Sequence, residues 1–132
     1  MKFNLETLLK GDVDFSNLIA PFTCKEIDDV LSEMPPDRAP GPDGFNGAFL
    51  KACWPIIKHD FYSLCSQFYE GNLDITSIND GHITLIPKVN TPMSVNDYRP
   101  ITLLNFCLKL ITKLLANHLQ RVILQLVHRN KY

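Results

Sequence analysis

The sequence has few of the residues from which disulfide-rich domains and metal sites are built. Its 132 residues include four cysteines, and no two of them form a Cys-x-x-Cys pair. Its four histidines do not pair with one another or with a cysteine at i, i+4 spacing. The sequence therefore predicts reduced, buried thiols in an intracellular protein, nuclear or cytoplasmic, and no metal site.

Long apolar runs and an N-terminal targeting segment are also missing. Residues 1–7 lack the apolar core of a secretory signal, and Lys113 interrupts the strongest apolar run before it reaches the length of a membrane span. With 45% hydrophobic and 20% charged residues, the composition is that of one globular unit. We expect one soluble domain with no membrane partner.

Acidic residues are absent from the C-terminal part of the chain. Residues 98–132 contain six Lys or Arg and no Asp or Glu, so the net charge of −1 conceals an acidic N-terminal part and a basic C-terminal part. Such asymmetry suggests that the C-terminal part faces an anionic partner. Ordinary solvated helix charge is the alternative.

Two short segments alternate aliphatic or β-branched residues between two faces, which is typical of strands. They are residues 83–88 and 97–104, and the polar loop 89–96 joins them. The pattern predicts a hairpin of half-buried strands with an exposed, mobile loop. Pro87 and Pro100 restrict its arms to a sheet edge or a strand end, because proline cannot donate to a ladder.

Two cations lie near the loop of this predicted hairpin, one on each arm. They are Lys88 and Arg99. An ammonium beside a planar guanidinium is a natural grip for a triphosphate. A pair of cations on a solvated sheet edge is the alternative.

Helices are predicted before the hairpin. Thr23 and Glu26 form a capping box that starts a helix ending near Met34, with an apolar face at Ile27, Val30, Leu31 and Met34. Residues 35–47 hold four of the nine prolines and three of the six glycines, so they are predicted to form a structured loop.

Two further helices are predicted between this loop and the hairpin. They span residues 45–53 and 55–70, with Trp54 as a packing hinge between them and Gly71 as the C-cap. Before all these elements, residues 1–21 show only a weak helical pattern followed by a polar loop, and no function follows from it.

A long helix is predicted over residues 105–127. Its buried stripe is expected at Leu108, Ile111, Leu115, Leu119, Val122 and Leu126. Lys109, Lys113, Asn117 and Arg121 recur on roughly the opposite side as a basic ridge, which is either a solvent face or a nucleic-acid contact. Leu110 and Leu114 lie next to that ridge, so we expect them to be exposed and to promote self-association.

Several of these segments resemble a known family. Residues 85–88 (Leu-Ile-Pro-Lys), 97–103 (Asp-Tyr-Arg-Pro-Ile-Thr-Leu) and 38–45 (Arg-Ala-Pro-Gly-Pro-Asp-Gly-Phe) resemble the fingers region of reverse transcriptases from plant LINE-type (non-LTR) retrotransposons. The resemblance runs from about Phe22 to the C-terminus. It divides the chain into an N-terminal segment, 1–21, and a fingers region, 22–132. The expected fold class is α+β, with helices around a small antiparallel hairpin, as an incomplete fingers and palm portion.

The resemblance implies roles for four residues. Lys88 and Arg99 look like the residues that hold the triphosphate of the incoming nucleotide. The loop with Asp43 and Gly44 matches a fingers motif beside the template strand, although a plain turn also explains Asp43. The cations of the basic ridge, Lys109, Lys113 and Arg121, are the further template-binding candidates. The partners implied are an RNA or DNA template-primer and a nucleoside triphosphate.

The catalytic carboxylates of this family are not found in the sequence. Such polymerases hold two Mg²⁺ ions on palm carboxylates. In reverse transcriptases one of these carboxylates lies in a strand after the long helix, and the others lie in an aromatic-x-Asp-Asp turn. The one Asp-Asp pair is Asp28-Asp29, in the helix before the fingers loop. We therefore expect an N-terminal fragment of an RNA-directed DNA polymerase that is inactive alone and binds no metal. A retained nucleic-acid-binding module and a non-functional transposon remnant are the alternatives.

Overall fold

The first described element is a short turn of 3-10 helix, η1, at Ser16–Leu18. The structure is a computed structural model that describes residues 14–129, with side chains through Leu124. The weak helical pattern expected at the start of the 1–21 segment lies outside the described residues. Leu126 of the predicted apolar stripe also lies beyond the described side chains.

Helix α2 spans Cys24–Glu33 and begins as its sequence predicts. The Thr23 hydroxyl accepts a bond from the Glu26 N–H at 3.2 Å, and the Glu26 carboxylate accepts one from the Thr23 N–H at 3.0 Å. These two bonds satisfy backbone donors that a helix start leaves free. The predicted face is confirmed, because Ile27, Val30 and Leu31 are buried.

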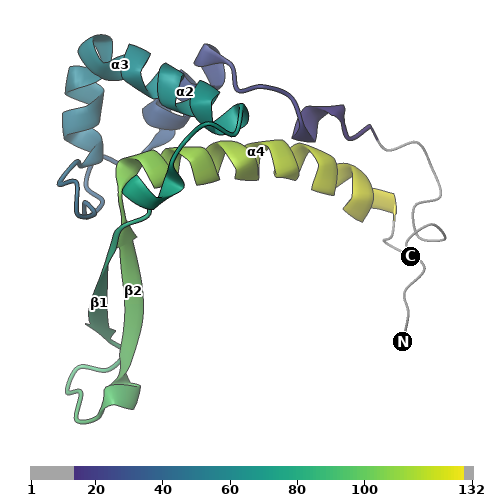
Figure 1. Cartoon of the computed structure of the whole chain (residues 1–132). Helices are drawn as coiled ribbons and strands as arrows, with labels where there is room; N and C mark the ends of the chain where they lie inside the picture. The colour runs from purple at the N-terminus through teal and green to yellow at the C-terminus, as the bar shows by residue number, and fades with distance from the viewer. Residues whose placement is uncertain (1–13, 130–132) are drawn as a thin grey trace.

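Helix α3 is one continuous element, Gly47–Tyr69, and this corrects the prediction of two helices. Pro55 lies inside it and Trp54 is a helical residue, so neither marks a break. A proline removes one helical hydrogen bond and usually kinks the helix, and Figure 1 shows α3 changing direction along its length. Burial on α2 and α4 sustains the helix through the proline. Gly71, at φ +76°, follows its end as expected.

The hairpin is present, with strand β1 at Gly81–Pro87 and strand β2 at Tyr98–Leu104. The strands are antiparallel, in a register that runs from Gly81 opposite Leu104 to Pro87 opposite Tyr98. The expectation of half-buried strands is wrong. All of β1 and most of β2 are exposed, because the hairpin projects away from the helices, as Figure 1 shows.

Helix α4 spans Phe106–Arg129, and its buried face matches the predicted one only in part. Its buried residues are Phe106, Leu110, Ile111, Leu114, His118 and Val122. Ile111 and Val122 are buried as predicted. Leu115 and Leu119, expected in the core, are 42% and 47% exposed, whereas Leu110 and Leu114, expected at the surface, are fully buried. The apolar residues of α4 cover more than one face, and the packing of α2 and α3 selects the face that passes through His118.

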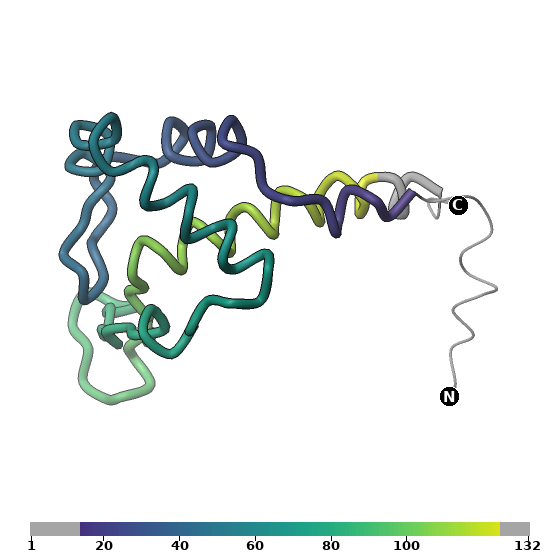
Figure 2. The backbone as a smooth tube through the Cα atoms, turned by 45° about the horizontal axis from the view of Figure 1, so that its top comes forward, coloured from purple at the N-terminus to yellow at the C-terminus, as the bar shows by residue number. Residues whose placement is uncertain are grey.

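The core lies where the three helices meet. It contains Ile27, Val30 and Leu31 from α2, Leu50, Phe61 and Cys65 from α3, and Phe106, Leu110 and Leu114 from α4. Figure 1 shows α2 and α3 on one side of α4, with the hairpin leaving its N-terminal end toward the other side. In Figure 2, α3 runs obliquely to α4, and η1 lies along the C-terminal half of α4. The fold is α+β, as predicted.

Helix α4 is the longest described element, so its length and hydropathy show whether a described helix could span a membrane. No helix among the residues that the structure describes is both long and apolar enough to cross a membrane.

Candidate nucleic-acid and nucleotide contacts

Lys88 and Arg99 lie on the same exposed face of the hairpin. Arg99 is paired with Ile86, and directly paired residues point their side chains to one face. Lys88 follows Ile86 by two residues and continues the ladder by donating its N–H to the Asp97 carbonyl at 2.7 Å. The two cations are therefore diagonal neighbours near the tip, as a shared anionic ligand requires.

The loop at the hairpin tip is built around Asp97. Its carboxylate accepts bonds from the N–H groups of Met93 and Ser94, each at 3.0 Å, and these bonds lower the pKa of Asp97. The Lys88 ammonium donates to the Asn96 carbonyl at 2.8 Å. The loop is exposed, as predicted, and its internal bonds fix the backbone from which Lys88 extends.

Asp43 joins the loop predicted at residues 35–47, the proline-rich loop, to the start of α4. One oxygen of its carboxylate accepts a bond from the Phe106 N–H at 2.6 Å, and the other accepts one from the Phe45 N–H at 3.2 Å. The Asp43 N–H donates in return to the Asn105 side chain at 2.9 Å. Asp43 thus caps α4 from a distant part of the sequence, which favours the architectural explanation of this residue.

Two glycines let the same loop pass close to the hairpin base. Gly44 has φ +73° and donates to the Gly41 carbonyl at 3.0 Å, which closes the predicted turn. Gly41 is buried against backbone, because a Cβ atom there would lie 2.3 Å from the Leu104 carbonyl oxygen. The loop is thereby fixed against the junction of β2 with α4.

A cavity of about 530 Å³ opens between α2, the proline-rich loop and α4. Two predicted template-binding residues, Lys109 and Lys113, line it together with Arg38 and the acidic Glu33. The Lys109 ammonium also donates to the Ala39 carbonyl at 3.2 Å, so it holds the loop as well. The structure brings these three cations together around one hollow.

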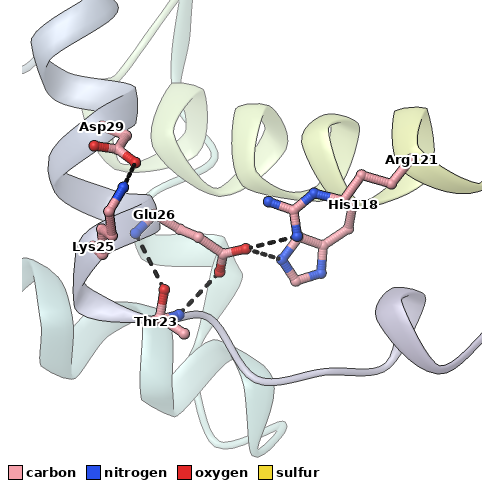
Figure 3. A network of polar contacts seen from close by, with 6 residues as sticks. All are labelled: Thr23, Lys25, Glu26, Asp29, His118 and Arg121. Atoms are coloured by element: carbon pink, nitrogen blue, oxygen red, sulfur yellow. Dashed lines mark hydrogen bonds and ion pairs between the residues drawn. The ribbon is translucent and has the colours of Figure 1, made fainter.

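Arg121 lies apart from that cavity and is already paired. Its guanidinium is 3.2 Å from Glu26 Oε1, and the Nε2 atom of His118 is 3.1 Å from the same oxygen (Figure 3). Burial alone would raise the pKa of Glu26, but the Thr23 N–H, His118 and Arg121 together outweigh it and lower the pKa. Glu26 therefore links the start of α2 to the middle of α4.

A second polar link joins α2 to α3. Asp28 accepts bonds from the Trp54 indole at 2.7 Å and from the Tyr62 hydroxyl at 2.6 Å. The bond to Asp28 is the main reason that the pKa of Tyr62 rises to about 12. Asp28 and Trp54 therefore serve packing, and neither behaves as a free site residue.

Cys65 and Cys107 are not activated nucleophiles in this arrangement. All four cysteines are free, but only Cys65 is fully buried and Cys24 is exposed, so the expectation of buried thiols is wrong for Cys24. Burial is the main reason that the pKa of Cys65 rises to about 12, and the nearby Cys107 adds a smaller effect. Burial is also the main reason that the pKa of Cys107 is raised, and Asp43 adds to it. Such thiols stay protonated at neutral pH.

The residues present do not form a divalent-metal site. Among the residues that the structure describes, no group of three or more His, Cys, Asp or Glu side chains is placed to hold a metal ion. Mg²⁺ prefers several carboxylate, phosphate or water oxygens in octahedral geometry.

The sequence singles out Lys88, Arg99, Lys109 and Lys113 as candidates, and their roles stay predictions. The sequence gives Arg38 and Phe45 only as part of a loop motif, whereas the structure places both in the cavity lining. The sequence gives Glu26 only as a helix cap. Its second role depends on His118 and Arg121, which are 92 and 95 positions away, and no local pattern reveals such a pairing.

The amino-acid sequence of the chain is similar to that of a transposon protein. No protein-family model matches it. A relative in Xenopus laevis, described as "Transposon TX1 uncharacterized 149 kDa protein", is 28% identical over 112 residues. The match covers 84% of this chain and 8% of the relative, so the chain spans a small part of that protein's length.

Proposed function

We propose, starting from this similarity to a transposon protein, that the chain is the fingers segment of a reverse transcriptase of LINE-type, non-LTR retrotransposons. In this role Lys88 and Arg99 hold the triphosphate of the incoming nucleotide, and the loop around Asp43 and Gly44 lies beside the template strand. The observation that carries the proposal is the common exposed face of Lys88 and Arg99 on a projecting hairpin.

The chemistry of the two cations suits a triphosphate. A guanidinium can donate to two phosphate oxygens at once, whereas an ammonium acts as a compact point charge. Pro100 restricts Arg99 to an extended backbone, so the side chain starts from a fixed direction. Among the described residues, no side-chain hydrogen bond or ion pair involves the Arg99 guanidinium, so its donors are free for a ligand.

In the proposed template contact, some residues position the loop and others contact the phosphates. Both oxygens of Asp43 are occupied by backbone donors, so Asp43 positions the loop, and Gly44 allows the turn that exposes it. Lys113 is exposed on α4 and free to approach a phosphate, while Lys109 is shared with Ala39. Arg121 contributes less than the sequence predicts, because Glu26 already neutralises it.

Catalysis belongs to the intact enzyme of which this segment is proposed to be a part. The Mg²⁺ ions that such enzymes use would neutralise the nucleotide phosphates and require carboxylates in addition to those described here. The contribution of this chain is then to bind and orient the triphosphate and the template.

The test replaces Arg99 by Lys in a complete reverse transcriptase that carries this segment in place of its own. Loss of a charge-assisted bond to phosphate should cost about 1.5–3 kcal/mol, or roughly tenfold to a hundredfold in kcat/KM for the nucleotide. Affinity for the primer-template should stay unchanged. Lys88→Ala should act similarly, and the double variant should be less than additive, because both side chains hold one group.

A different result would assign the hairpin to another role. If Arg99→Ala weakens primer-template binding and leaves the nucleotide dependence unchanged, the triphosphate assignment is wrong. The hairpin would then be a template clamp.

The second candidate function is a nucleic-acid-binding module without catalysis. The clustering of six Lys or Arg in residues 98–132 favours it, because phosphate backbones attract such a surface whatever their sequence. Binding by the chain alone that falls steeply with added salt, together with no effect of Arg99→Lys in the complete enzyme, would favour this function over the first.

A further inference from the structure

The cavity between α2, the proline-rich loop and α4 combines an apolar lining with a net positive charge. It is partly open to solvent, more of its lining is apolar than polar, and its charged residues are three cations and one acid. Its volume of about 530 Å³ is in the range of small-molecule sites, roughly 300–1,000 Å³. We infer that this cavity binds one nucleotide unit of a single-stranded nucleic acid.

The charged side of the cavity fits a phosphodiester. Arg38, Lys109 and Lys113 line it, and Glu33 is its one acidic residue. Arg38 and Lys113 are exposed side chains, so they can reach a strand that passes over the opening. A guanidinium and an ammonium across one hollow can hold two oxygens of the same phosphate.

The uncharged side of the cavity fits a base. Phe45, Met34, Pro35 and Ala116 are among the residues that line it. The Phe45 ring is 41% exposed and stacks on Phe49, with centroids 5.3 Å apart and planes 7° from parallel. Phe49 thereby holds Phe45 as a fixed platform, and an exposed aromatic face can stack with a base of any sequence.

A strand fits better than a free anion or a free nucleotide. An inorganic anion would use the cations and leave the apolar lining without a partner. A strand also has further cations available to it outside the cavity, because residues 98–132 contain six Lys or Arg and no acidic residue. An unpaired base is required, because the stacked bases of a duplex cannot enter a hollow of this size.

This inference rests on the proposed function for the choice of nucleic acid as partner, and it deepens the template contact. It assigns to Arg38 and Phe45 a role that the fingers motif alone did not give them. The triphosphate role of the hairpin and the strand binding of the cavity are tested by independent measurements. The hairpin is tested by nucleotide dependence of turnover in a complete enzyme, and the cavity is tested by strand binding to this chain.

The experiment measures binding of a fluorescent twelve-nucleotide oligo(dT) to the 132-residue chain by anisotropy across a series of salt concentrations. Changing Arg38 and Lys113 together to Gln should reduce the slope of log K against log salt by about 1.4, or roughly 0.7 for each cation that contacts a phosphate of a single strand. The matched control changes Lys51 and Lys58 on α3 to Gln, removing equal charge outside the cavity lining. The control slope should not change.

The aromatic contact is tested separately, at constant charge. Phe45→Leu should weaken binding of the oligonucleotide by about fivefold or more, because base stacking on one aromatic ring contributes at least that much. Phe15→Leu is the control, since Phe15 is 43% exposed, close to the 41% of Phe45, and lies outside the cavity lining. Circular dichroism identifies any variant that does not fold, and Phe45→Tyr, which keeps the ring, should restore binding.

Three results would overturn the inference. The first is an equal change of slope in the cavity pair and the control pair, which would assign binding to diffuse charge. The second is unchanged affinity in Phe45→Leu. The third is competition by free thymidine monophosphate as strong, per nucleotide, as competition by unlabelled oligo(dT), which would mean that the cavity takes free nucleotides.

Discussion

Gly41, at the base of the hairpin, lies closer to neighbouring backbone than the other described glycines do. A Cβ atom at this position would lie 2.3 Å from the Leu104 carbonyl oxygen and 2.7 Å from the Asn105 nitrogen. Both neighbours are backbone atoms, so neither can rotate away. The proline-rich loop can therefore stay against the β2–α4 junction only while residue 41 has no side chain.

A single methyl group at Gly41 should be enough to disturb the fold. We expect Gly41→Ala to lower the free energy of unfolding by about 1–3 kcal/mol, as overpacking usually does, and to weaken strand binding with it. Urea denaturation measures the effect. Gly44→Asn is the control, because no atom lies within 4 Å of a Cβ there and Asn tolerates positive φ. Equal losses in both variants would contradict the packing argument.

Glu26 makes stability depend on pH in the acid range. Its folded pKa lies below the ordinary value of 4.5, so the unfolded state takes up a proton more readily. The stabilisation is therefore present above pH 4.5 and is lost as pH falls through the folded pKa. Glu26→Gln should reduce stability at pH 7 and flatten the pH dependence below 4.5, which thermal unfolding at several pH values would measure.

The comparison for this variant is Asp29→Asn, on the same helix. Asp29 pairs with Lys25 in an exposed i, i+4 salt bridge that contributes little. If Asp29→Asn flattens the acid dependence as much as Glu26→Gln does, the network of Glu26, His118 and Arg121 has no special role.

Among the elements, those with local signals could be predicted from the sequence. The capping box at Thr23 and Glu26 determines where α2 begins, and alternation with flanking turn residues determines the strands. The burial of an element depends on what packs against it. For that reason Leu110 and Leu115 were assigned to the wrong faces of α4, and the exposure of β1 was not expected.

The continuity of α3 illustrates the same limit. Pro55 is a local signal for a helix start, and the sequence offers nothing against that interpretation. Trp54 and Tyr62 lie on either side of it in the chain and both bond to Asp28 of α2. These tertiary bonds hold both halves of α3 in place, and local reasoning cannot include them.

The exposed apolar surface of α4 lies on another side of the helix than the sequence predicts. Leu115, Leu119 and Ile123 are between 41% and 47% exposed along one side of the helix. We expect the isolated chain to bind a hydrophobic dye or to self-associate through this side. Changing Leu115 and Leu119 to Gln should reduce both effects and shift the free energy of unfolding by only about 0.5 kcal/mol per site.

Leu114 provides the contrast, since it is fully buried on the other side of the same helix. Leu114→Ala should lower the free energy of unfolding by about 2–5 kcal/mol. Analytical ultracentrifugation and dye fluorescence would separate the two sides. A wild-type chain that is monomeric and silent toward the dye would show that the exposed leucines do not form an adhesive surface.

At the scale of the whole molecule, the proposed fingers role predicts binding of nucleotide and template without polymerisation by the chain alone. The printed sequence lacks the aromatic-x-Asp-Asp turn of polymerases, and the described residues hold no metal-binding group. We therefore expect no primer extension on RNA or DNA templates with Mg²⁺ or Mn²⁺. Gel analysis of a labelled primer tests this, and templated, metal-dependent extension by pure protein would contradict it.

The projection of the hairpin makes it a lever arm. Seven residues of strand at about 3.3 Å each place Lys88 roughly 23 Å from the hairpin base. A rotation of about 5° at that base would move the tip by about 2 Å, the difference between a hydrogen bond and none. Gly41 and Asp43 contact the β2–α4 junction and not the tip. Because they hold the base of the hairpin, they influence where Lys88 and Arg99 lie.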